Sequence, residues 1–172
     1  SYIDIEIYIH IHTYIQIYIH TDRQTNIYTY IHTNTNTTTN ANKRRAYAVN
    51  VHTNAIIGTI TNSGTISSGD WNALDIGDAE DVTINNTGTI SATTTQAIRA
   101  HAAVTGAVTI NNSGIISATD IVIYLYESDG ITLTNSGTIS ASSGSAIYSY
   151  YTDDTSITNT GTISGSAYGM SD

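Results

Sequence analysis

The fold is decided by one string that recurs five times: ITNSGTIS at 60–67, INNTGTIS at 84–91, INNSGIIS at 110–117, LTNSGTIS at 133–140 and ITNTGTIS at 157–164. Successive copies start 24, 26, 23 and 24 residues apart. Every copy has an aliphatic residue first, Asn third, Gly fifth, Ile seventh and Ser eighth. A repeat of this length indicates a solenoid, because one copy is a single coil that buries its apolar face only against its neighbours.

Strand geometry and corner chemistry explain why these positions recur. Alternate side chains of a strand point to opposite sides, so the aliphatic first and seventh residues of each copy can both face a core. Asn tolerates tight corners, and Gly supplies left-handed backbone there without a Cβ clash. When coils stack about 4.8 Å apart, equivalent residues lie over one another and asparagines can form an amide ladder. The expected ladder consists of Asn62, Asn86, Asn112, Asn135 and Asn159, with the corner glycines Gly64, Gly88, Gly114, Gly137 and Gly161.

A second apolar stretch in each coil points the same way. It reads ALDIG at 73–77, AIRAH at 97–101, IVIYL at 121–125 and AIYSY at 146–150. Aligned on these strings, the inward positions are Leu74, Ile98, Val122 and Ile147, and the outward ones are Asp75, Arg99, Ile123 and Tyr148. The sequence therefore predicts an all-β fold, a parallel β-helix (β-solenoid) of about five coils of 23–26 residues that spans residues 46–172.

Residues 1–45 follow a different rule and are predicted to be a separate low-complexity segment. From Ile3 to Thr39 nearly every odd position is Ile or Thr, and nearly every even position is Tyr, His, Asn, Asp, Glu or Gln. This alternation is typical of extended β structure, but one strand of such length would reach roughly 120 Å. Two interpretations stay open: a structured segment whose edges pair with other strands, or an extension that resembles a translated dinucleotide repeat.

Composition excludes several classes of site. The chain has no Cys, which excludes disulfides, a thiol nucleophile and Cys-ligated metal. Lys and Arg total 5 against 14 Asp and Glu, so a nucleic-acid surface is not expected. No apolar run approaches the roughly 20 residues of a membrane-spanning helix. No cofactor motif, metal site or catalytic set is predicted, and the chain is expected not to be an enzyme.

The best candidates for binding a partner are tyrosines in the last two coils. Exposed Tyr can stack on sugar rings or on a partner surface, although cross-strand aromatic pairs also stabilise a sheet without any ligand. The candidates are Tyr124, Tyr126, Tyr148, Tyr150 and Tyr151.

Three other clusters have both a functional and a structural interpretation. Asp75 and Arg99 could act on polysaccharides, but a solvent-exposed ion pair is favoured. His10 and His12 could chelate a metal, but no third ligand is implied. The Thr and Ser after each corner Gly could form an ice-binding hydroxyl ladder, although Thr suits exposed strands by propensity. That ladder comprises Thr65/Ser67, Thr89/Ser91, Thr138/Ser140 and Thr162/Ser164, and Ile115/Ser117 interrupts it.

The string N-[ST]-G-T-I-S, at 62–67, 86–91, 135–140 and 159–164, resembles the β-helical passenger repeats of bacterial autotransporters and related surface adhesins, over roughly residues 54–172. The resemblance implies a scaffold outside the cell or on a bacterial surface, but no particular activity. No secretory leader or C-terminal membrane barrel is recognised, as expected for a fragment or a short relative. We expect a non-enzymatic structural or adhesion scaffold. Its expected partners are copies of itself, end to end or through edge strands, and glycans or a host or matrix surface. Ice binding and polysaccharide-directed catalysis are the alternatives.

Overall fold

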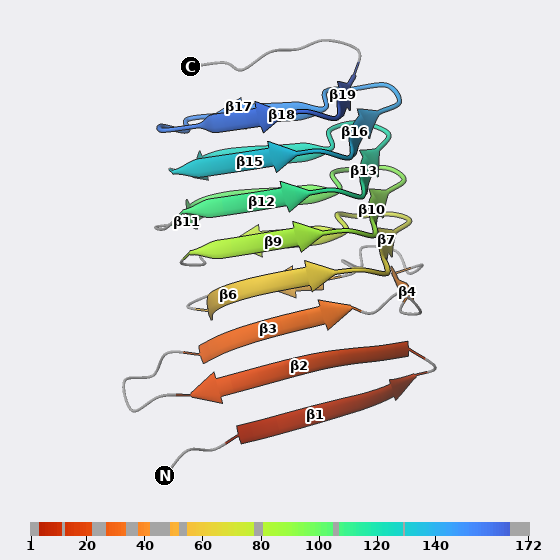
Figure 1. Ribbon diagram of the computed structural model, residues 1–172, viewed down its shortest axis with the longest axis vertical. Coiled ribbons are helices and arrows are strands. Elements are labelled where there is room, and N and C mark those ends of the chain that lie inside the picture. Colours follow the sequence, from red (N-terminus) through yellow and green to blue (C-terminus); the bar gives the residue numbers. More distant parts are fainter. Residues whose placement is uncertain are drawn as a thin grey trace.

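Three β-sheets run along the long axis of the molecule and enclose one apolar core (Figure 1). The computed structural model describes residues 4–11, 13–21, 27–33, 38–41, 49–51, 55–77, 81–104, 107–128 and 130–165. No helix occurs among these residues, so none there is long and apolar enough to cross a membrane. The all-β solenoid that the repeat predicts is confirmed.

Sheet A has eight strands in the order β1-β2-β3-β6-β9-β12-β15-β18. These are β1 (Asp4–Ile11), β2 (Thr13–Thr21), β3 (Ile27–Thr33), β6 (Ala55–Asn62), β9 (Val82–Asn86), β12 (Val108–Asn112), β15 (Ile131–Asn135) and β18 (Ser156–Asn159). Sheet B consists of β4 (Thr38–Ala41), β7 (Thr65–Ser68), β10 (Thr89–Ala92), β13 (Ile115–Ala118), β16 (Thr138–Ala141) and β19 (Thr162–Ser164). Sheet C consists of β5 (Val49–Val51), β8 (Leu74–Gly77), β11 (Ile98–Val104), β14 (Ile123–Ser128) and β17 (Ile147–Tyr150).

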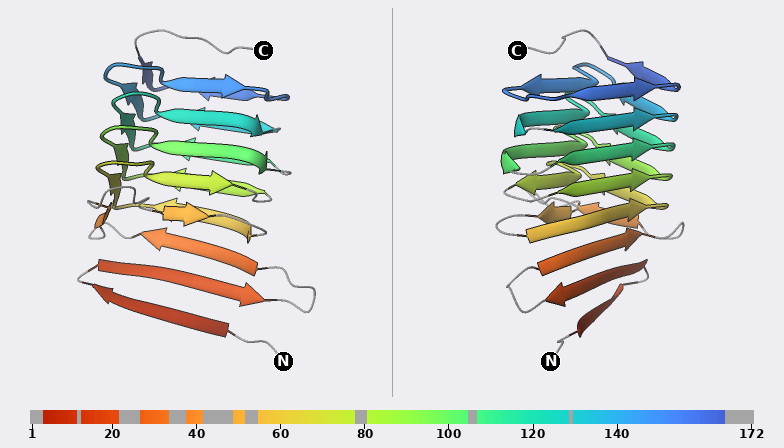
Figure 2. Two further views of the ribbon diagram at one scale, coloured as in Figure 1. Left: turned by 180° about the vertical axis from the view of Figure 1, so that it is seen from behind. Right: turned by 60° about the vertical axis from the view of Figure 1, so that its left-hand side comes forward.

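The chain passes through sheets A, B and C in turn, so that each circuit adds one parallel strand to every sheet (Figure 2). Residues 55–150 make four complete circuits. Strands β3, β4 and β5 extend the three sheets toward the N-terminal end, and β18 and β19 extend two of them toward the C-terminal end. The predicted boundary at residue 45 falls between β4 and β5, and the two-segment division stays a prediction.

The alternating segment forms three shorter strands of 8, 9 and 7 residues rather than one long one. β1 and β2 pair antiparallel, β2 and β3 pair antiparallel, and β3 joins β6 in parallel. The residues between β2 and β3, 22–26, lie outside the described part of the chain. The segment is thereby paired into sheet A through its main chain.

Stacked aliphatic columns form the core. In sheet A, Ile60, Ile84 and Ile110 pair in register and are fully buried. Sheet B contributes a second column of fully buried isoleucines: Ile66, Ile90, Ile116 and Ile139. Burial of each such side chain stabilises the fold by about 1.5–3 kcal/mol, so the columns are the main source of stability.

The predicted register of sheet C is wrong in one coil. Ile98 pairs with Ile123, not with Val122, and Ile123 pairs with Ile147. Ile123 is therefore a fully buried core residue, and Tyr124 takes the outward position. Val122 is buried one position earlier, where Ala73, Ala97 and Ala146 occupy the other coils. The strings IVIYL and AIRAH do not align by their first letters, because Ile123 follows its corner glycine Gly114 by 9 residues, whereas Ile98 follows Gly88 by 10.

Candidate functional site

The outer face of sheet C carries the predicted aromatic and charged residues in two adjacent columns. The first column is Asp75, Arg99, Tyr124 and Tyr148, and the second contains His101, Tyr126 and Tyr150. The parallel register explains both columns, because residues two apart on one strand share a face and equivalent residues stack on the next strand. The structure thus brings all five predicted tyrosines together on this side.

The tyrosine rings stack on one another along the solenoid axis. Tyr124 and Tyr148 have ring centroids 5.4 Å apart and planes 3° apart, and Tyr126 and Tyr150 have centroids 5.8 Å apart and planes 12° apart. Tyr151 is 61% exposed and tilts against Tyr150 at 4.1 Å. Because the ring faces cover each other, solvent meets mainly ring edges and hydroxyl groups. Stacked pairs of this kind also stabilise the sheet by about 0.5–1.5 kcal/mol each.

Two of these phenols are harder to ionise than ordinary tyrosine. A hydrogen bond to the Glu127 carboxylate, with a smaller contribution from burial, raises the pKa of Tyr126 above 10.0. A hydrogen bond with Tyr151 is the main cause that raises the pKa of Tyr150. Both groups therefore stay protonated, and able to donate a hydrogen bond, at all ordinary pH values.

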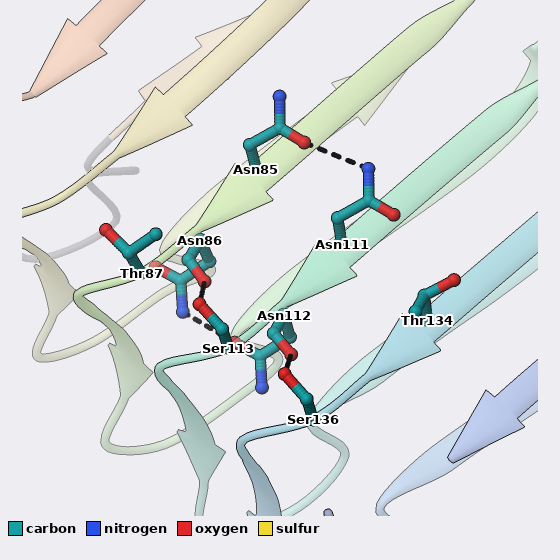
Figure 3. A pocket seen from close by; sticks show the side chains of 8 residues that line it. All are labelled: Asn85, Asn86, Thr87, Asn111, Asn112, Ser113, Thr134 and Ser136. Atoms are coloured by element: carbon teal, nitrogen blue, oxygen red, sulfur yellow. Dashed lines mark hydrogen bonds between the residues drawn. The ribbon is translucent and has the colours of Figure 1, made fainter. Parts of the chain in front are cut away.

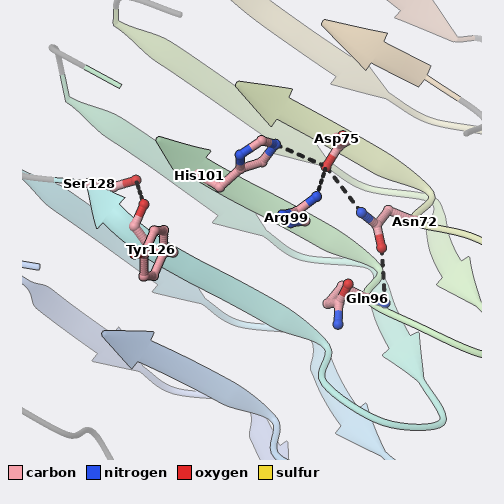
Figure 4. Close-up of polar contacts among 7 residues, drawn as sticks. All are labelled: Asn72, Asp75, Gln96, Arg99, His101, Tyr126 and Ser128. Atoms are coloured by element: carbon pink, nitrogen blue, oxygen red, sulfur yellow. Dashed lines mark hydrogen bonds and ion pairs between the residues drawn. The ribbon is translucent and has the colours of Figure 1, made fainter. Parts of the chain in front are cut away.

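Asp75 is the centre of a polar cluster at the N-terminal end of the same face (Figure 4). Its Oδ1 accepts a hydrogen bond from Asn72 at 3.0 Å and lies 3.7 Å from Arg99 Nη1 and 3.6 Å from His101 Nε2. The Asp75 side chain is 0% exposed, whereas that of Arg99 is 32% exposed. The prediction of a solvent-exposed ion pair is therefore wrong for the carboxylate, because strand β11 and the Asn72 loop cover it. Sequence reasoning missed Asn72, which has no charge to draw attention to it.

The predicted asparagines form one continuous chain of hydrogen bonds at the corner between sheets A and B. Each Nδ2 donates to the Oδ1 of the next coil at 2.7–2.8 Å. The same Nδ2 also donates to the Gly carbonyl two residues on and to a carbonyl in the next coil, as Asn112 does at 3.3 and 3.2 Å. Because four of the five side chains are at most 3% exposed, these bonds satisfy amides that would otherwise be buried unpaired.

The corner glycines are required for a different reason from the one predicted. Among the described residues, Gly130 is the glycine with a positive φ, so the ladder glycines do not need left-handed backbone. Instead, a Cβ added to Gly114 would lie 2.1 Å from the carbonyl oxygen of Gly88. A Cβ added to Gly137 would lie 2.1 Å from the carbonyl oxygen of Gly114. Gly is present because successive corners touch backbone to backbone.

A groove of about 210 Å³ follows this corner on the outside (Figure 3). Only amide and hydroxyl side chains line it: Asn85, Asn86, Thr87, Asn111, Asn112, Ser113, Thr134 and Ser136. In it, Asn111 donates to the Oδ1 of Asn85 at 2.9 Å on the exposed side. The groove is thus neutral and hydrogen-bonding, and the buried ladder forms its floor.

Hydroxyl columns cover two faces of the solenoid. On sheet B the predicted Thr and Ser columns are in register, and Ile115 interrupts the Thr column with 47% of its surface exposed. Sheet A has a second column that sequence reasoning missed: Thr59, Thr83, Thr109, Thr132 and Ser156. The signal was available, because a hydroxyl residue precedes the aliphatic residue that begins each repeat string. Between residues 59 and 164, the outward strand positions of both sheets carry no charge.

The proposed His chelate cannot be placed, since His12 lies outside the described residues and the side chain of His10 is not described. No group of three or more metal-ligating side chains occurs in the described part of the chain. No family model matches the sequence, and comparisons with curated proteins and with solved structures give no significant match.

Proposed function

We propose that the chain is a non-enzymatic structural and adhesion scaffold that works outside the cell or on a bacterial cell surface, as the resemblance to autotransporter passenger repeats implies. The observation that carries the proposal is the continuous amide ladder, which holds equivalent residues of successive coils in one register. A backbone fixed in this way displays its outward side chains as regular arrays. Regular arrays suit partners that themselves repeat, such as glycan chains or further copies of the protein.

The tyrosine face (Tyr124, Tyr126, Tyr148, Tyr150 and Tyr151) is the adhesive surface in this proposal. Tyr is enriched in protein interfaces because it combines a large apolar body with a hydroxyl group. Since the ring faces are stacked on one another, contact with a glycan would use the hydroxyl groups and ring edges. This arrangement makes the phenolic oxygen, rather than the ring, the decisive group.

The test compares Tyr→Phe with Tyr→Ala variants for retention on immobilised neutral glycans and matrix proteins. Phe keeps the stacked columns and removes only the hydroxyl groups, so a variant with Phe at 124, 126, 148 and 150 should fold normally and lose retention. Thr132→Val, which removes a hydroxyl from sheet A, is the matched control and should bind like the wild type. Unchanged retention of the quadruple Phe variant would refute the tyrosine face as the adhesive surface.

The buried state of Asp75 supports the non-enzymatic part of the proposal. A catalytic carboxylate must reach the proton it transfers, within about 2.6–3.2 Å. Asp75 is enclosed by Asn72, Arg99 and His101 and is 0% exposed, so its role here is to hold β8, β11 and the preceding loop together. Hydrolase or lyase activity that disappears in Asp75→Ala, with folding retained, would contradict this.

Ice binding is a second candidate, favoured by the uncharged hydroxyl columns of sheet A. Neighbouring hydroxyls there repeat about every 4.8 Å along the axis, which is a regular spacing for ordering water. The exposed Ile115 breaks the corresponding column on sheet B. Thermal hysteresis of the purified protein decides this candidate, and Thr109→Lys on sheet A should abolish hysteresis if the surface is correct.

A further inference from the structure

Among the described residues, the C-terminal end of the solenoid is an open cross-section. Strands β17, β18 and β19 are the last strands of sheets C, A and B (Figure 1). Ile157 continues the core column of sheet A, yet it is 40% exposed, whereas Ile84 and Ile110 in the same column are 0% exposed. The apolar column therefore reaches the surface at this end without a further residue of the described chain to cover it.

The hydrogen bonds of the asparagine corner give this end a direction. The N–H groups of each corner donate backward: Ser136 and Gly137 donate to the carbonyl of Asn112, and Thr138 donates to the carbonyl of Gly114. The carbonyls of the corner Asn and Gly consequently face the C-terminal end, and this pattern holds in four successive corner pairs. At the last corner the Asn159 carbonyl accepts no hydrogen bond from the described residues. Its Nδ2 makes one bond, to Gly161, where Asn112 makes three.

This direction decides between two ways of joining identical copies. If two C-terminal ends met, corner carbonyls would face carbonyls and the two Asn159 amide groups would face each other donor to donor. Polar groups that are buried unpaired in such a contact destabilise it. If the second copy instead presents its N-terminal end, carbonyls do not face carbonyls and amide donors do not face donors.

The N-terminal end offers a strand of the correct direction and pattern. β1 is antiparallel to β2, β2 is antiparallel to β3, and β3 is parallel to β6, so β1 runs in the same direction as β18. Beyond a register shift between Tyr28 and Tyr30, one row of Cα partners can be followed from one edge of sheet A to the other. The positions in this row are Ile7, Ile17, Ile31, Ile60, Ile84, Ile110, Leu133 and Ile157.

We propose that a second copy of the chain docks head to tail, with its β1 edge paired in parallel to β18. In this arrangement Ile7 of one copy continues the row over Ile157 of the other, and sheet A runs unbroken through both. The inference rests on the self-association included in the proposed function and adds its orientation and its strands. Repetition of the contact builds a polar filament, because a head-to-tail interface does not close on itself when it translates along one axis.

Single-cysteine variants test the orientation directly, because the chain has no Cys of its own. Glu6 on β1 and Ser156 on β18 belong to one row of Cα partners that crosses sheet A, and they are its first and last members. The proposed contact therefore places Glu6 of one copy beside Ser156 of the other, on adjacent parallel strands. Their Cα atoms would lie about 4.8 Å apart, within the range of a disulfide. Under mild oxidation, a mixture of Glu6→Cys and Ser156→Cys chains should cross-link, and neither variant should cross-link alone. Cross-linking of Ser156→Cys alone, or of Glu6→Cys alone, would overturn the head-to-tail arrangement.

Ile157→Lys tests the apolar contact by sedimentation, in about 0.5 M salt so that the acidic residues near both edges are screened. The self-association constant should fall at least about tenfold, while Thr132→Lys, on the outer face of the same sheet, should associate like the wild type. If the wild type associates and Ile157→Lys associates equally well, this contact is refuted, although self-association is not. A wild type that is monomeric at every concentration would refute this inference, whereas the glycan-retention test of the tyrosine face would stand.

Discussion

Replacement of Asn112 by Ala removes the central rung of the amide ladder and should be among the most damaging single changes in the solenoid. Asn112 Nδ2 donates to Asn135, Gly114 and Thr138, and its Oδ1 accepts from Asn86 at 2.8 Å. A typical hydrogen bond contributes about 0.5–1.5 kcal/mol net. Because Nδ2 has two hydrogens, its three contacts count as about two full bonds, and with the bond to Oδ1 the rung is worth about 3 kcal/mol. In a chain of this size that loss lowers Tm by about 6–12 °C.

Asn111 supplies the matched control, because it is the same residue type one position earlier. It is exposed and makes one side-chain hydrogen bond, to Asn85 at 2.9 Å. Asn111→Ala should therefore lower the free energy of unfolding by less than about 1 kcal/mol. The assay is urea unfolding followed by circular dichroism for both variants. Equal midpoints for Asn111→Ala and Asn112→Ala, or a loss below about 1 kcal/mol for Asn112→Ala, would refute the claim that the buried ladder stabilises the corner.

Three further perturbations probe the corner, the polar cluster and the tyrosine face. Gly114→Ala should destabilise the fold by at least about 3 kcal/mol in the same unfolding assay, since its Cβ would lie 2.1 Å from the Gly88 carbonyl and separate the two corners. Ser113→Ala, at the neighbouring exposed position, should change stability by less than about 0.5 kcal/mol, and equal effects of the two would argue against the backbone contact. Asp75→Ala should lower the free energy of unfolding by about 1–3 kcal/mol, because buried Asn72 loses its hydrogen bond and His101 loses a partner, while Arg99 can still reach water. A neutral effect would show that the cluster does not stabilise sheet C. The raised pKa of Tyr126 means that the folded state holds this proton longer than the unfolded state, so the stabilisation is complete below pH 10.0 and is lost as pH rises through the folded-state pKa. Tyrosinate absorbance should therefore show a phenol that titrates late, and Glu127→Gln, which removes the main cause, should bring that titration back toward the ordinary value.

The repeat strings allowed the solenoid, its coil length and the position of the asparagines to be predicted, because each of these depends on local pattern. The five asparagines are spaced by whole coils, and stacking at one strand spacing leaves them no other place than above one another. The aliphatic columns follow for the same reason. Periodic features of this kind need no knowledge of the rest of the chain.

Features that depend on contact between coils could not be predicted in this way. The register of β14 was predicted one residue early, since only the backbone pairing of Ile98 with Ile123 shows that the segment between Gly114 and this strand is one residue shorter than its counterparts. The division of the alternating segment at residue 12 carries no turn signature, because the Ile/Thr alternation has the same form on both sides of it. The burial of Asp75 likewise depends on Asn72 and on strand β11, neither of which a charge pattern identifies.

Two features of the corner, the requirement for glycine and the direction of the main-chain hydrogen bonds, have one physical origin. Corner N–H groups can donate to the preceding coil only if the two backbones come within hydrogen-bond distance, as Thr138 N and the Gly114 carbonyl do at 2.9 Å. At that separation a Cβ on the later glycine has no space, so Gly is required whatever its φ. The Asn side chain then donates in the opposite direction, to the following coil, and locks each corner to both neighbours.

A corner that is hydrogen-bonded on both sides cannot accept an inserted residue, whereas the segments that lead to the next repeat absorb the variation in coil length between 23 and 26 residues. The asparagine corner is therefore the element that fixes the register of sheets A and B, which it joins.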